Sequence, residues 1–97
     1  MTVNGLQLIP FYITELKHIQ DFSIKEIVND MTFLNQSEGY DVYVNNTQLV
    51  EGQEFNIGGG YREVNYENYT VRFVANGNPV VAKKCIVLLK QYKNIRL

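Results

Sequence analysis

The chain has 97 residues, of which 45% are hydrophobic and 20% charged, ordinary values for one globular domain. We therefore predict a single domain over residues 1–97, and the composition excludes two domains or a largely disordered chain. The formal net charge of −1 gives the chain no overall field that would favour nucleic acid or an anionic membrane.

The charges are unevenly distributed along the chain. Residues 1–67 hold all ten acidic residues and three basic ones, whereas residues 68–97 hold six basic residues and no acidic one. Neighbouring strands that interleave the two parts would cancel these charges, whereas separated charges would give a two-signed surface suited to head-to-tail packing. A basic C-terminal strand that contacts nucleic acid is a third interpretation, which the apolar run at residues 85–89 disfavours.

Cysteine content and the N-terminal sequence bear on the compartment. Cys85 is the one cysteine, so an intramolecular disulfide is excluded, and its place in CIVLL predicts a buried small side chain. The first residues, MTVNGLQLIPFYI, lack a basic segment followed by a clear apolar one, so we expect no secretory signal. No apolar run approaches the ~20 residues of a membrane helix. We expect a protein made in the cytoplasm without a membrane partner.

The first predicted elements are a strand and the one helix. Residues 6–14 have an extended character, and Pro10, which has no amide hydrogen, predicts a sheet edge or a break in the ladder. Ser23 and Glu26 have the spacing of a capping box. Helical spacing of apolar residues then predicts a short α-helix over about residues 23–35, packed on a sheet or offering a groove to a partner. These apolar residues are Ile24, Ile27, Val28, Met31 and Leu34.

From residue 40 onward the apolar residues alternate with a period of two, which predicts strands. Turns are expected at residues 45–46, 51–52 and 76–79. The last predicted strand is apolar on both faces, as in a central or covered strand. We predict a mostly β fold, a β-sandwich or meander of immunoglobulin-like size, with the short helix against one face or end. The strands are expected at residues 40–44, 47–50, 54–57, 69–74 and 80–92.

The sequence contains no recognisable catalytic or metal-binding constellation. His18 is the single histidine, whereas catalytic triads and most zinc sites combine His with Cys, Asp or Glu at defined spacing. A pair of His18 with Cys85 would need an exposed thiolate, which a buried strand disfavours. Residues 58–60 are three glycines after a strand, but they lack the Gly-Lys-Ser/Thr ending of a phosphate loop. We expect no enzyme activity, no cofactor and no metal.

Residues 42–57 have the sequence VYVNNTQLVEGQEFNI. A strand, a Val-Asn-Gly-type turn, a leucine, Glu-Gly and an acidic–aromatic pair resemble a hairpin pattern of fibre and virion proteins from tailed bacteriophages. Asn46 replaces the usual turn glycine, Glu54-Phe55 replaces the commoner Asp-Tyr, and a glycine-rich and tyrosine-rich stretch follows. The resemblance implies a virion structural protein, either a capsid auxiliary or decoration subunit or a fibre or tail adaptor. Its partners would be major capsid, fibre or tail subunits, or further copies of this chain.

Two segments are the candidate contact elements of such an assembly, the tyrosine-rich loop at 61–69 and the basic C-terminal segment at 90–97. Tyrosines bury apolar area with a polar tip, although the same rings also pack in cores. Terminal arms that become ordered on a neighbour are a common assembly device. The alternatives are a small β module that binds carbohydrate or nucleic acid through the tyrosines, and a host-directed protein inhibitor. The candidate interface residues are Tyr61, Arg62, Tyr66, Tyr69, Lys90, Tyr92, Lys93 and Arg96.

Overall fold

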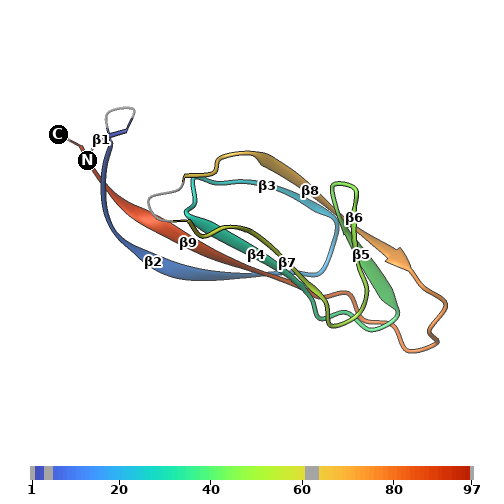
Figure 1. Ribbon diagram of the computed structural model, residues 1–97. Coiled ribbons are helices and arrows are strands. Elements are labelled where there is room, and N and C mark those ends of the chain that lie inside the picture. The colour runs from blue at the N-terminus through green and yellow to red at the C-terminus, as the bar shows by residue number, and fades with distance from the viewer. Residues whose placement is uncertain (1, 4–5, 61–63, 97) are drawn as a thin grey trace.

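Figure 1 shows a computed structural model of the chain, which describes the backbone of residues 2–3, 6–60 and 64–96 and the side chains of residues 13–60 and 64–91. The described residues form two antiparallel sheets and no helix, so the predicted mostly β class is confirmed and the helix is wrong. The five-stranded sheet runs, in spatial order, β1 (Thr2–Val3), β2 (Leu6–His18), β9 (Cys85–Arg96), β4 (Asp30–Asn35) and β7 (Glu54–Gly58). The four-stranded sheet runs β3 (Phe22–Lys25), β8 (Asn68–Ala75), β5 (Tyr40–Val44) and β6 (Thr47–Leu49).

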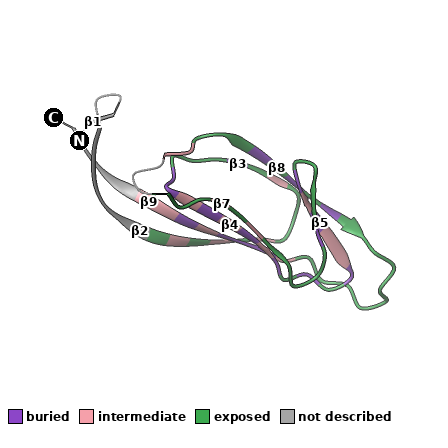
Figure 2. Ribbon diagram, viewed as in Figure 1, coloured by how far each residue is buried: buried purple, intermediate pink, exposed green. Residues whose placement is uncertain are grey.

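The two sheets face each other over one hydrophobic core, as in a β-sandwich (Figure 2). The strand β8 shows how the sequence produces this arrangement. Tyr69, Val71 and Phe73 point inward and are buried. Thr70 and Arg72, which alternate with them, are exposed. An alternation of period two therefore places one apolar face against the opposite sheet, and each square ångström buried there stabilises the fold by about 25 cal/mol.

The segment predicted to be helical instead contributes one strand to each sheet. Ser23 lies within β3, where it pairs with β8, and Glu26 follows the end of that strand. Met31 and Phe33 are fully buried two residues apart in β4, whereas Ile27, a member of the predicted helical stripe, is 47% exposed. The β-branched and aromatic residues of this segment fit a pleated, half-buried surface. Pairing with distant strands therefore outweighs the helical spacing.

The strands expected after residue 40 are found close to their predicted places. β5 covers residues 40–44, and Asn45, at φ 53°, turns the chain into β6 as predicted. β9 is the central strand that its two apolar faces indicated, with β2 on one side and β4 on the other. It begins at Cys85 and not at residue 80, because the Val80 N–H donates to the side chain of Asn78 (3.0 Å) within a loop.

The two long terminal strands define the shape of the molecule. β2 and β9 pair along their length, with an irregularity at Pro10, where a break in the ladder was predicted. β4 pairs with β9 only as far as Lys90, so the rest of β9 has β2 as its partner. These strands extend past the sandwich (Figure 1), and the molecule measures 54 × 21 × 20 Å. We call residues 6–12 and 91–96 the terminal ribbon.

Candidate functional site

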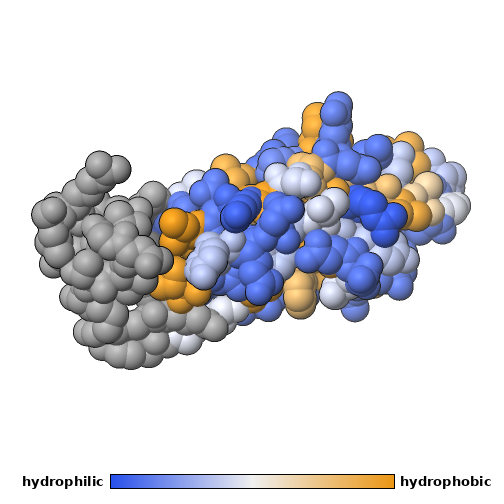
Figure 3. All heavy atoms as spheres, turned by 90° about the horizontal axis from the view of Figure 1, so that it is seen from above, coloured by the Kyte–Doolittle hydropathy of each residue, from blue (hydrophilic) through white to orange (hydrophobic). Residues whose placement is uncertain are grey.

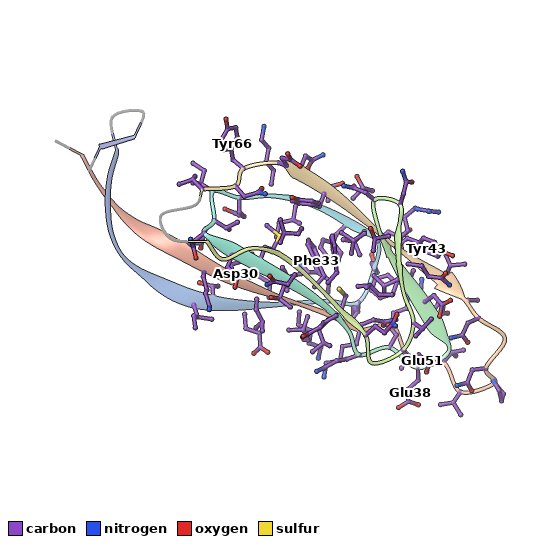
Figure 4. The ribbon with its side chains drawn as sticks, viewed as in Figure 1. Asp30, Phe33, Glu38, Tyr43, Glu51 and Tyr66 are labelled. Atoms are coloured by element: carbon purple, nitrogen blue, oxygen red, sulfur yellow. The ribbon has the colours of Figure 1, made fainter. Side chains whose placement is uncertain are left out.

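The tyrosine-rich loop is divided between the core and the surface. Tyr69 is only 6% exposed, and its ring packs edge-on against Phe33 with the ring centres 5.7 Å apart. Tyr66 is 61% exposed and points away from the sandwich (Figure 4). Tyr61 and Arg62 lie outside the described residues. Of the two tyrosines of this loop whose side chains the structure describes, only Tyr66 exposes its ring to a possible partner.

A shallow hollow of about 300 Å³ lies beside this exposed ring, lined by Val64, Asn65, Tyr66 and Glu67. Sites for small ligands bury most of the ligand surface, and sites for bases or single strands usually stack several aromatic rings. The described lining supplies one ring and one carboxylate, which would repel a phosphate. The hollow therefore gives little support to a carbohydrate-binding or nucleic-acid-binding module.

The basic C-terminal segment is described in full only at its beginning. The Lys90 ammonium lies 3.7 Å from the Asp30 carboxylate at the partly exposed surface of β4 and β9. Tyr92, Lys93 and Arg96 lie in β9 within the terminal ribbon, where the backbone alone is described. An exposed ion pair of this kind contributes at most about 1 kcal/mol. The pair nevertheless brings a cation of the basic part, residues 68–97, beside an acid of the acidic part, residues 1–67, as expected if the strands of the two parts interleave.

Two further C-terminal cations contact aromatic rings of the N-terminal part. The Arg72 guanidinium lies 5.1 Å from the centre of the Tyr43 ring, directly across the β5/β8 ladder. The Lys83 ammonium lies 5.2 Å from the centre of the Tyr40 ring. Cation–π contacts at exposed sites are worth about 0.5–1 kcal/mol. These contacts hold both cations beside aromatic rings of one strand, β5.

His18 and Cys85, far apart in the sequence, lie opposite each other in the β2/β9 ladder. The prediction that Cys85 is buried is confirmed, and burial raises the pKa of its thiol to about 11, so the sulfur stays protonated near neutral pH. The imidazole of His18 stacks on Phe22 with the ring centres 3.6 Å apart, and burial lowers its pKa below the usual value. A protonated thiol beside a neutral imidazole is not an activated nucleophile, so both side chains act in packing.

We expect the free energy of unfolding to fall between about pH 7.5 and about pH 5.5, and His18→Gln to lessen that fall. The imidazole of the unfolded chain gains a proton as the pH drops through about 6.5, whereas the folded imidazole, with its lowered pKa, resists protonation. Proton uptake therefore favours the unfolded state, and stability is lost as the pH decreases. Urea unfolding of both proteins across this range measures the effect. Equal pH dependence in the two proteins would contradict the assignment.

The exposed apolar residues were not singled out from the sequence. Hydrophilic side chains cover most of the described surface seen in Figure 3, with hydrophobic ones in scattered patches. Elsewhere, Ile13 within β2 and Ile19 just after that strand are more than half exposed, as are Val80 and Val81 in the loop before β9. In the sequence ITELKHI, Ile13 and Ile19 are an even number of residues from Glu15 and Lys17, and this shared phase is the one local signal that could have placed the two isoleucines on an outer, charged face.

No group of three or more His, Cys, Asp or Glu side chains that could hold a metal ion occurs among the described residues. The same part of the chain contains no helix able to cross a membrane. The sequence matches no protein-family model, and comparison with curated proteins and with solved structures found no match.

Proposed function

We propose that the chain is a non-enzymatic structural protein of a tailed-phage virion, either a capsid auxiliary or decoration subunit or an adaptor for a fibre or tail. The observation that carries the proposal is the terminal ribbon, in which β9 beyond Lys90 pairs with β2 alone among the described strands. A two-stranded ribbon is marginally stable by itself in water. Main-chain hydrogen bonds and burial against a neighbouring chain would stabilise it. A sandwich with such a projection suits assembly.

The virion part of the proposal is supported by the resemblance in residues 42–57. In this segment β5 and β6 form a hairpin of one sheet, and the turn at Glu51 leads the chain across to β7 in the other. The Glu51 carboxylate accepts hydrogen bonds from the Gly39 N–H (3.2 Å) and the Asn76 side-chain amide (2.8 Å). Glu51 is labelled in Figure 4, near one end of the sandwich. The acidic residue of the pattern thus has a structural role that a rigid scaffold needs.

The proposal is tested by the protein composition of purified particles of the virus that encodes this chain. Particles are isolated on density gradients, and this chain is quantified by mass spectrometry against isotope-labelled peptides of known amount. We expect a copy number in a simple ratio to the major capsid, fibre or tail subunits. If this chain is abundant in the lysate but missing from the particles, the proposal is wrong and a host-directed inhibitor is favoured.

A further inference from the structure

The outer edge of β2 is the longest unpaired strand edge in the described part of the chain. β1 covers this edge only at Leu6 and Gln7, and residues 8–18 pair with β9 on their other side. The edge strands β3, β6 and β7 are five residues long or shorter. Proteins usually protect a long edge with proline, bulges or covering loops. Here the irregularity at Pro10 interrupts only the first part, so residues 11–18 form an edge with no strand paired on its outer side among the described residues.

The side chains along this open edge alternate between two faces. Leu16 faces the core but is only partly buried, because no strand flanks it on the outer side. The opposite face carries exposed apolar residues at both ends and two opposite charges between them. Ile13 in β2 is 64% exposed, and Ile19, in the bend directly after β2, is 60% exposed. Glu15 and Lys17 lie between them and are exposed.

We propose that two copies of the chain join along this edge, β2 against β2, antiparallel about a two-fold axis at Leu16. The two five-stranded sheets would then form one continuous sheet. Glu15 of each copy would lie opposite Lys17 of the other, and Ile13 opposite Ile19. The inference deepens the proposed function, on which it rests for its biological setting, because it names a second copy as one partner in the assembly.

The order of the charges selects this register. Paired side chains in an antiparallel ladder lie on the same face, so a symmetric pair of strands must be centred on a single residue. A pair centred on Glu15 would place that carboxylate opposite its own copy, and a pair centred on Lys17 would do the same with the ammonium. Like charges directly opposite each other are destabilising, whereas opposite charges attract. Centring on Leu16 replaces both repulsions with two attractions.

The same register also satisfies the other groups along the edge. Backbone N–H and C=O groups that face away from β9 would gain main-chain partners, which is the source of affinity in strand addition. The pairing would cover Ile13 and Ile19, the most exposed large hydrophobic residues near β2. On the core side, the Leu16 side chains of the two copies would meet and cover the surface that each leaves open.

The test is a reversal of the charges, singly and together. Molar mass is measured by light scattering on a sizing column, over a concentration series, for the natural chain, Glu15→Lys, Lys17→Glu and the double variant. We expect the natural chain to shift from monomer to dimer as its concentration rises. Each single reversal places like charges opposite each other at both pairs and should raise the dissociation constant about tenfold or more. The double variant exchanges the charges and should associate like the natural chain.

Amide hydrogen exchange gives a second measurement that locates the interface. In β2, the amides of residues 13–18 that face away from β9 should exchange slowly only at concentrations where the dimer forms. Both reversals are at exposed positions, and urea unfolding checks that each variant keeps its stability. A monomer at every concentration, or a double variant that associates no better than the single ones, overturns the inference. Particle composition reports on the virion role separately, so the two proposals can fail independently.

Discussion

Replacement of Asn35 by alanine is expected to lower the free energy of unfolding by about 3–5 kcal/mol, because two buried hydrogen bonds and one partly buried hydrogen bond each lose a partner. Asn35 is fully buried. Its Nδ2 donates to the carbonyls of Tyr40 (3.0 Å) and Leu49 (2.9 Å), and its Oδ1 accepts from the Ser37 N–H (2.9 Å). Alanine would take one hydrogen-bond partner from each of these three backbone groups, and the loss of a partner is costly away from water.

The position of Asn35 explains why one amide matters so much. Asn35 ends β4 in the five-stranded sheet, whereas Tyr40 begins β5 and Leu49 ends β6 in the other sheet. The side chain therefore ties the two layers together where the chain passes between them. Small domains are stable by about 5–15 kcal/mol in total, so the expected loss is a large share of the margin. Urea unfolding at equilibrium, followed by circular dichroism, measures it.

Two variants separate the buried hydrogen bonds from other effects. Asn56→Ala removes an exposed amide that donates to the Thr32 hydroxyl (2.8 Å) and to the Asp30 carboxylate (2.5 Å), and it should cost less than about 1 kcal/mol, because water replaces the lost donor at both acceptors. Asn35→Asp keeps the volume and the acceptor for Ser37 but loses both donors, and it should destabilise at least as much as alanine. Equal stability of the Asn35→Ala and Asn56→Ala proteins would refute the role assigned to Asn35.

The alternation after residue 40 predicts β5, β6 and β8 well, because each of them buries one face, and turn residues such as Asn45 and Gly52 follow β5 and β6. Residues 23–35 do not carry that information locally. Their apolar positions suit a helical stripe and also two short strands, and the choice depends on β8, β9 and β7, which follow much later in the chain. Local propensity does not include pairing with strands so distant in the sequence, so the predicted helix is wrong.

The candidate contact residues show the same limit. Tyr66 and Tyr69 are equivalent by residue type, but Tyr69 shares the inward face of β8 with Val71 and Phe73. The strand predicted at residues 69–74 already contains Tyr69 in phase with Val71 and Phe73, so its alternation could have placed Tyr69 in the core. The open edge of β2 is different, because it follows from the order of strands in the sheet. Pro10 is the one local signal for an edge in β2, and it does not distinguish an edge from a break in the ladder.

Gly39→Ala is expected to destabilise the fold by about 2–5 kcal/mol, whereas Gly52→Ala should cost only about 1–2 kcal/mol. Both glycines have a positive φ, +78° and +84°, which disfavours any L side chain to a similar degree. A Cβ on Gly39 would also press against the carbonyl oxygen of Val80 and lie 2.9 Å from Cγ1 of Val81, whereas a Cβ on Gly52 would meet nothing within 4 Å. The difference between the two variants therefore isolates the cost of steric contact.

The close approach at Gly39 holds the loop before β9 against the end of the sandwich. The Asn76 N–H donates to the Gly39 carbonyl (3.0 Å), and Glu38 and Ala82 exchange two backbone hydrogen bonds. A methyl group at residue 39 would push this loop outward. The amide hydrogens of Glu38 and Ala82 should therefore exchange faster in Gly39→Ala than in the natural chain, whereas their exchange rates should be unchanged in Gly52→Ala. Urea unfolding and amide exchange of both variants measure the two effects. Equal losses of stability would mean that the loop yields freely and that backbone strain alone requires glycine here.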